Sequence, residues 1–312
     1  MKEKLFVLFT MDVEPTATKL GASGPKSDKA GMQSLQDFCS VLDKSGYRPT
    51  CFVHPELIEA YPEFYIQLAQ AGTGIGLHLH TTKFAPAKQE CELGGLCPDE
   101  QQRLLTMAVE MFERGFKSRP KIFRPGCFSA NDATFNILVQ LGFIGGGISI
   151  PERIWTDRYC VWSGSYPYAH YAHKAFRQCQ GNLPFVDIPL SVDLTTPLVH
   201  NPVGFLHHPD LRPGGVYSKT DEVPFDRRKL LHNILHKMAQ DNPPVKTLVI
   251  DGHNDRDFLS SDSDAAAHLN AVIDGIPAVC SELGWQPVSA TYEEVIAHFM
   301  QMHPLEEGSP CM

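Results

Sequence analysis

The sequence of 312 residues has no excess of basic side chains and no apolar run long enough to cross a bilayer. Asp and Glu outnumber Lys and Arg by 36 to 27, for a net charge of −9 and a pI near 5.8. Such a chain has no basic field for a phosphate backbone, so we expect no nucleic acid partner. No stretch approaches the ~18 apolar residues of a membrane span, and we expect none.

Cysteine pairs of the CxxC type are also missing, although the chain has nine cysteines. Their absence argues against a thiol-ligated structural zinc and a thioredoxin-like motif. The N-terminal apolar segment runs directly into acids and has no small-residue cleavage site. It therefore predicts a strand rather than a signal peptide, and the expected location is cytoplasmic.

Apolar, β-branched runs alternate with helical patterns along the chain. The predicted strands are 5–9, 50–53, 74–79, 121–123, 143–148, 185–190 and 247–250, and the predicted helices are 31–45, 57–71, 99–116, 131–141, 226–240 and 263–283. This alternation indicates βαβ units and an α/β fold with a barrel-like or doubly wound parallel sheet. We predict one domain over 1–300, an irregular insertion or functional loop region at about 151–225, and a tail at 301–312.

Two acids follow the first predicted strand. Asp12 and Glu14 stand at i and i+2, so an extended backbone directs both side chains to the same side. Paired carboxylates repel unless a cation or a shared proton offsets their charge, which makes the pair a candidate for metal binding or acid/base catalysis. The alternative is a solvated strand exit ended by Pro15.

The third predicted strand ends in His78 and His80, again at i and i+2. Two imidazoles on one side of a strand can bind a metal together, and with Asp12 and Glu14 they offer ligands suited to zinc or a similar divalent ion. A single histidine in this place would more often be structural.

Two further segments end in charged or titratable residues. Arg124 follows the fourth strand and could hold a carboxylate in its ionised form, or be a surface residue before a turn. His253 follows the last strand close to Asp251 and Asp255, where a general acid is one interpretation and a loop histidine without a role is the other.

The remaining histidines and aromatic residues give weaker signals. His232 and His236 lie one helical turn apart, but no acid partner is evident, so a solvated helix face is expected. The aromatic residues between 155 and 171 could stack on sugar rings or close a core.

Taken in order, these motifs resemble the polysaccharide deacetylase family, the NodB-homology group or carbohydrate esterase family four. The resemblance spans roughly residues 5–300 and is strongest to a branch with Asp-x-Glu, HLH and FR-x-G motifs. It implies a distorted (β/α)7 barrel and a hydrolase that acts on non-peptide carbon–nitrogen bonds.

The resemblance also implies roles for residues. Asp12 corresponds to the catalytic base and Glu14 to the acidic metal ligand, although Val13 separates the two acids and their roles could be exchanged. His78 corresponds to the first metal histidine, and Arg124 to the arginine that orients the base.

His253 corresponds to the general acid. The family's second metal histidine falls four residues after the first, at Thr82, so His80 would have to complete the metal site, with Glu14 and His78 as the other ligands. The implied cofactor is a divalent metal, with zinc expected.

The implied substrate is an N-acetylated amino sugar or glycan precursor. A metal-poor, allantoinase-like amide hydrolase is the second hypothesis, and a non-catalytic carbohydrate-binding protein on the same fold is the third. The sequence indicates no oligomeric state.

Overall fold

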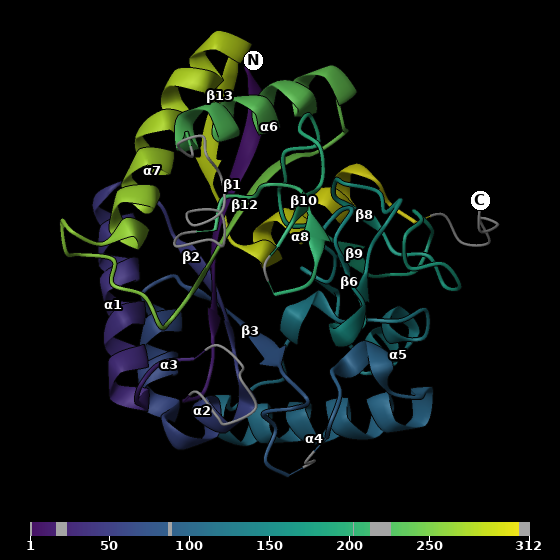
Figure 1. Cartoon of the computed structure of the whole chain (residues 1–312). Coiled ribbons are helices and arrows are strands. Elements are labelled where there is room, and N and C mark those ends of the chain that lie inside the picture. Colours follow the sequence, from purple (N-terminus) through teal and green to yellow (C-terminus); the bar gives the residue numbers. More distant parts are fainter. Residues whose placement is uncertain (1, 17–23, 87–88, 202, 213–225, 306–312) are drawn as a thin grey trace.

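The computed structural model describes residues 2–16, 24–86, 89–201, 203–212 and 226–305. Within these ranges the main sheet follows the order β12-β1-β2-β3-β4-β5-β9-β8 (Figure 1). All of its neighbouring strands are parallel except β8, which pairs antiparallel with β9. The strands of the main sheet are β12 (Lys246–His253), β1 (Glu3–Val13), β2 (Pro49–Val53), β3 (Gly74–Leu79), β4 (Ile122–Pro125), β5 (Gly145–Gly146), β9 (Val186–Asp187) and β8 (His170–Tyr171).

The seven predicted strands are the seven parallel strands of this path, from β12 to β9. The α/β, barrel-like class predicted from the sequence is therefore confirmed. A further strand, β13 (Trp285–Ser289), pairs with the first half of β1, while β2 pairs with its second half. Because β1 has neighbours along both edges, residues 5–14 are all buried, as expected for a central parallel strand. Its place in the sheet confirms the prediction of a strand at this position.

Helices follow most strands and lie outside the sheet (Figure 1). They are α1 (Asp28–Lys44), α2 (Pro55–Ala60), α3 (Pro62–Gln70), α4 (Pro98–Phe116), α5 (Thr134–Gln140), α6 (Arg227–Asp241), α7 (Asp264–Leu283) and α8 (Tyr292–Met302). The single helix predicted at 57–71 is wrong in one respect. Pro62 has no backbone N–H and begins a new helix, so the segment divides into α2 and α3.

In their described part, residues 151–225 contain two-residue strands and one short 3-10 helix, Thr156–Arg158. Four of the strands, β6 (Ile154–Trp155), β7 (Cys160–Val161), β10 (Val199–His200) and β11 (Leu206–His207), form a second small sheet. The segment also supplies β8 and β9 to the main sheet, so an insertion with its own boundaries stays a prediction. Residues 213–225 lie outside the described residues.

The predicted tail begins too early. α8 continues to Met302, so residues 301 and 302 are helical, and 306–312 lie outside the described residues. A capping box begins this helix: Thr291 Oγ1 accepts from the backbone N–H of Glu294, whose carboxylate accepts from the N–H of Thr291. In the described part of the chain, no helix has the length and apolar character of a membrane span.

Candidate active site

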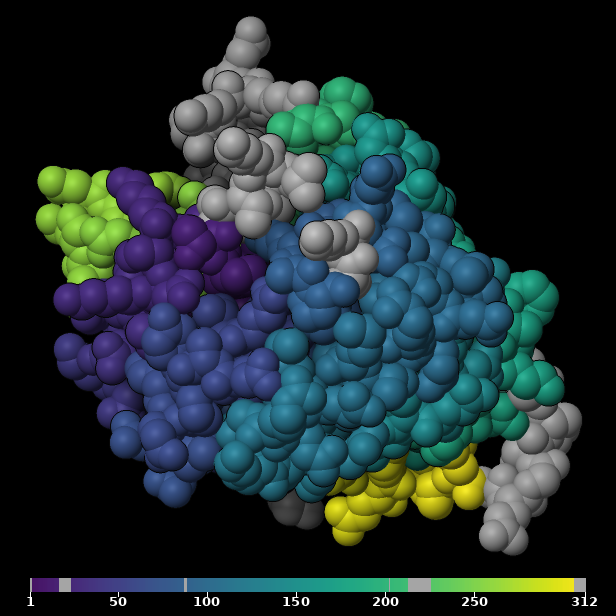
Figure 2. Space-filling view, turned by 90° about the horizontal axis from the view of Figure 1, so that it is seen from below, coloured from purple at the N-terminus to yellow at the C-terminus, as the bar shows by residue number. Residues whose placement is uncertain are grey.

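The carboxyl ends of β1, β3, β4 and β12 meet at one end of the sheet. The registers place Asp12 opposite His253 and His78 opposite Arg124. Figure 2 views the molecule from below, where purple residues that follow β1 lie beside yellow-green residues that follow β12. A hydrogen bond of 2.6 Å from Ser34 Oγ to the carbonyl of Arg256 joins these two parts. Parallel sheets build their sites at this end.

Arg124 is fully buried between two carboxylates. Its Nη1 donates to Asp12 Oδ1 at 3.0 Å and to Asp251 Oδ1 at 2.6 Å, and its guanidinium lies 4.3 Å from the centre of the Phe52 ring. Although burial opposes its charge, the two acids raise the pKa of Arg124. Burial and the nearby Asp12 raise the pKa of Asp251, while Arg124 opposes this shift.

A second group contains Glu14, His78 and His80, each offering one ligand atom within 4.8 Å of the others. His80 Nε2 lies 3.2 Å from Glu14 Oε1, and the two imidazole rings meet edge to face at 5.0 Å. His78 Nδ1 lies 3.0 Å from the carbonyl oxygen of Arg124, while its buried Nε2 has no hydrogen-bond partner. Burial, followed by the nearby charges, lowers the pKa of His78 well below its usual value, so the ring is neutral.

Glu92 contacts the imidazole of His80 on the side opposite Glu14. His80 Nδ1 lies 2.9 Å from Glu92 Oε1, and the same oxygen accepts a hydrogen bond of 2.8 Å from the Thr82 hydroxyl. Burial opposes the charge of His80, but Glu92 outweighs it and raises the pKa of His80 to about 9. Burial likewise opposes the charge of Glu92, and His80 lowers the pKa of that carboxyl to about 2.

Lys83 brings a buried cation to the same site. Its Nζ donates to Glu14 Oε2, which leaves Oε1 directed at the imidazoles. Burial lowers the pKa of Lys83 to about 8. Glu14 therefore has a positive charge beside it without a bound ion.

His253 is the most accessible of the predicted residues, with 25% of its side chain exposed. Its Nε2 lies 3.7 Å from Glu14 Oε1, and it forms a cluster with Asp12 and Asp251. The next residue, Asn254, exchanges two hydrogen bonds with the backbone of Glu14, at 2.9 and 3.0 Å. These bonds tie the end of β12 to the end of β1.

The donor set fits a divalent metal ion. The separation of 3.2 Å between His80 Nε2 and Glu14 Oε1 is that of neighbouring ligands around zinc, which are about 3.3 Å apart. The unpartnered Nε2 of His78 supplies a third donor. Both imidazoles are oriented through Nδ1, by Glu92 and by a backbone carbonyl, as metal-binding histidines usually are. Thr82 is engaged with Glu92, which favours His80 as the ligand.

All six predicted site residues come together in the structure: Asp12, Glu14, His78, His80, Arg124 and His253. Sequence reasoning did not assign Asp251, although it alternates with His253 as Asp12 does with Glu14. It missed Glu92 and Lys83, which follow β3 in a segment without periodic pattern. It also missed Tyr292, whose hydroxyl accepts from Arg124 Nη2 at 3.2 Å.

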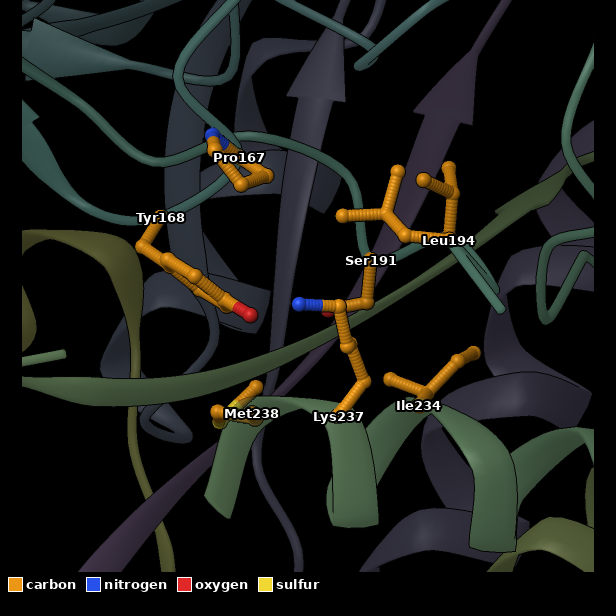
Figure 3. Close-up of a pocket in the computed structure, with 8 residues that line it drawn as sticks. Pro167, Tyr168, Ser191, Leu194, Ile234, Lys237 and Met238 are labelled. Carbon is orange, nitrogen blue, oxygen red and sulfur yellow. The ribbon is translucent and has the colours of Figure 1, made fainter. Parts of the chain in front are cut away.

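One pocket lies away from these residues, between α6 and the segments around 167 and 191. Figure 3 shows Tyr168, Lys237 and Ile234 among its lining side chains, and no predicted site residue belongs to them. The Tyr168 hydroxyl donates to Asp241 at 2.5 Å, so this polar group is already engaged.

Comparison with known proteins gives one family. Residues 23–145 match the family model of polysaccharide deacetylases. This family consists of hydrolases that act on amide bonds of acetylated polysaccharide. The matched segment includes His78, His80 and Arg124, whereas Asp12, Glu14 and His253 lie outside it.

Solved structures share the fold over almost the whole chain. One is a protein of Mycobacterium smegmatis provisionally named a polysaccharide deacetylase, with 17% identity, a TM-score of 0.61, and coverage of 100% of this chain and 93% of that one. A protein of Parabacteroides distasonis, provisionally named a glycoside hydrolase/deacetylase, has 10% identity, a TM-score of 0.69, and coverage of 98% and 73%. Puue allantoinase has 11% identity, a TM-score of 0.60, and coverage of 96% and 92%.

At these identities the similarity concerns the fold alone, and it confirms the predicted barrel of the NodB-homology type. No protein with a curated description matches the sequence. The family resemblance predicted from the motifs is confirmed, while the narrower Asp-x-Glu and HLH branch stays a prediction.

Proposed function

We propose that this chain is a metal-dependent hydrolase that removes an N-acetyl group from an amino sugar or a glycan precursor. The observation that carries the proposal is the contact between two groups. Glu14, with the imidazoles of His78 and His80, lies directly beside the group of Asp12, Asp251 and His253. A metal centre and an acid/base pair that lie together at the carboxyl ends of the strands suit amide hydrolysis.

Glu14, His78 and His80 would hold the divalent ion, for which zinc is the expected choice. When bound, the ion would polarise the acyl carbonyl and lower the pKa of a water molecule. Among the ligands, Glu14 supplies the negative charge and both histidines supply a ring nitrogen, for which His80 has to release its proton. This division of roles assigns Glu14 as ligand and leaves Asp12 free for proton transfer.

Asp12 would accept the proton of the attacking water. Its Oδ1 already accepts from Arg124, which fixes the orientation of the carboxylate. Its second oxygen is the one available for the water. Asp251 shares Arg124 and so balances the charge of the guanidinium, which makes it a positioning residue.

His253 would donate a proton to the nitrogen of the departing amine. An amide nitrogen is a poor leaving group until it is protonated, so a general acid is needed on the substrate side. The partial exposure of His253, in a site otherwise buried, suits this position.

Release of acetate from N-acetylated amino sugars and their oligomers tests the proposal. Asp12→Asn and His253→Ala should each remove most turnover while the unfolding midpoint stays close to that of the wild type. Asp43→Asn, on the exposed face of α1, is the matched control and should leave turnover unchanged. Normal acetate release by either site variant would contradict the assignment.

A metal-poor amide hydrolase is the second candidate, and the contact of Lys83 with Glu14 favours it. In such an enzyme the ammonium of Lys83 would balance Glu14 in place of an ion. Metal analysis and chelation separate the two candidates. If the purified chain holds no divalent metal, keeps its amide hydrolase activity in chelator and loses it in Lys83→Met, the second candidate replaces the first.

The cytoplasmic location stays a prediction that cell fractionation can test. The contacts of β1 concern Glu3–Val13 alone. This segment is a central strand of the main sheet and is therefore not a signal peptide that is cleaved off.

A further inference from the structure

Two histidines and a glutamate come together on the surface formed by α6 and α7. His232 and His236 lie one turn apart on α6, and Glu282 lies in the last turn of α7. Their ligand atoms fall within 4.8 Å of one another. The sequence pattern showed no acid partner for the two histidines, because the partner comes from another helix 46 residues after His236.

The geometry is that of a preformed three-ligand site. Glu282 Oε2 lies 3.5 Å from His236 Nε2 and 3.8 Å from His232 Nε2, close to the ~3.3 Å between neighbouring ligands of a tetrahedral zinc ion. The imidazole rings are stacked, with centroids 3.8 Å apart and planes inclined by 22°. Stacking directs both Nε2 atoms toward the same carboxylate oxygen.

His236 Nε2 is buried and has no hydrogen-bond partner, although the carboxylate lies 3.5 Å away. A buried nitrogen without a partner has a cost that a ligand can remove. A cation between the three groups would satisfy both nitrogens and the carboxylate at once.

Close packing of the two helices holds these residues in place. Gly275 of α7 lies against Leu231 of α6, where a Cβ would come within 2.8 Å of Leu231 Cδ2. Figure 1 shows the two helices crossing near the end of the molecule at which the N-terminus is marked. His232 and Glu282 line a surface groove, and Arg228 and Lys229 line the same groove about one turn before His232. Their positive charges would attract an anion that binds to the metal ion as a further ligand.

The cluster is separate from the candidate active site. Glu282 lies three residues before Trp285, which pairs with Glu3 at the start of β1, whereas Asp12 lies at the other end of that strand. Asp12 lies nine residues after Glu3 along the strand, a distance of roughly 30 Å.

We propose that His232, His236 and Glu282 bind one divalent transition-metal ion that joins α6 to α7. Two imidazoles and one carboxylate favour zinc, nickel or copper over magnesium or calcium. Side-chain exposures of 48% for His232 and 58% for Glu282 leave the fourth coordination position open to water.

Zinc titration of the full chain tests the proposal, with the chain metal-stripped and free of any polyhistidine tag. Isothermal calorimetry and metal analysis after gel filtration should show two bound ions in the wild type. His236→Ala and His232→Ala should each lose one, and their acetate release should be unchanged. His200→Ala, another exposed histidine outside the cluster, is the matched control and should keep both ions.

The two sites are separated by Glu14→Gln, which should lose the active-site ion and keep the ion on α6 and α7. In this background Cu²⁺ should give an EPR spectrum with splitting from two imidazole nitrogens, and His236→Ala should abolish that splitting. The proposal is overturned if His236→Ala and His232→Ala bind as much zinc as the wild type. If instead Glu14→Gln and the wild type both bind one ion that His236→Ala loses, this proposal stands and the metal-dependent function fails.

Discussion

The backbone of Gly126 lies directly against the imidazole of His80. A Cβ on Gly126 would stand 2.2 Å from His80 Nδ1, far inside van der Waals contact. The same nitrogen is the one that Glu92 holds at 2.9 Å. Glycine at this position therefore lets His80 lie between Glu92 and Glu14.

Gly126→Ala is expected to displace His80 and to weaken both metal binding and acetate release. Overpacking of this kind costs about 1–3 kcal/mol of stability, so the variant should still fold. Calorimetric zinc titration and denaturant unfolding measure the two effects. Gly46→Ala is the control, because its φ of +76° makes alanine unfavourable while no atom lies within 4 Å of the added Cβ. It should lose stability and retain metal binding, and unchanged zinc affinity in Gly126→Ala would contradict the prediction.

Replacement of Arg124 by methionine should destabilise the protein by about 3–5 kcal/mol, because it leaves Asp12 and Asp251 buried without their cation. Asp251→Asn in the same chain should recover part of the loss. Urea unfolding of the two variants and the wild type measures both changes. Arg48→Met is the matched control, since the Arg48–Glu294 pair is about half exposed and should contribute less than about 1 kcal/mol. A loss in Arg124→Met no larger than in Arg48→Met would refute the prediction.

The His80–Glu92 pair predicts a particular pH dependence for the metal-free protein. The pKa of His80 is raised from 6.5 to about 9, so its stabilisation is complete below pH 6.5 and is lost as the pH rises through 9. The pKa of Glu92 is lowered from 4.5 to about 2, so its stabilisation is present above pH 4.5 and is lost as the pH falls through 2. Glu92→Gln should therefore cost most between pH 4.5 and 6.5.

The expected cost there is about 3 kcal/mol, from the shift of His80. At pH 9.5 and above most of it should disappear. Unfolding free energies of wild type and Glu92→Gln in chelator, at pH 5.5 and pH 9.5, provide the measurement. An equal cost at both pH values would show that the pair does not depend on the charge of His80.

Asp12→Asn and Glu14→Gln should fail in different ways. Glu14→Gln should lose the active-site zinc, since it removes the charged ligand, whereas Asp12→Asn should bind zinc normally and lose turnover. Metal analysis of both variants beside acetate assays distinguishes them. If Asp12→Asn loses the ion and Glu14→Gln keeps it, the two acids have exchanged the roles proposed here.

Local patterns in the sequence were enough to predict the parallel strands and most helices. Strand alternation also placed Asp12 with Glu14 and His78 with His80, because a period of two is a property of the backbone alone. By contrast, α8 was missed although its capping box at Thr291 and Glu294 is a local sequence pattern.

Contacts that join distant segments could not be predicted in the same way. Glu92 and Lys83 reach the site from a segment whose course depends on tertiary packing, and Glu282 meets His236 only because α6 and α7 cross. The break between α2 and α3 at Pro62 could have been predicted from the sequence, because proline lacks the N–H that an uninterrupted helix requires.

The pairing of β1 with β12 has a consequence for the order of events during synthesis. Thr10 donates to the carbonyl of Ile250 at 2.9 Å, so strands about 240 residues apart in sequence are neighbours in space. Contacts of such long separation form slowly and only once both segments exist. A ribosome-bound chain that has not yet released residue 253 lacks the β12 neighbour of β1 and lacks His253, the proposed general acid. The proposed site is thus complete only after residue 253 has been released, and until then the edge of β1 that pairs with β12 is open to aggregation.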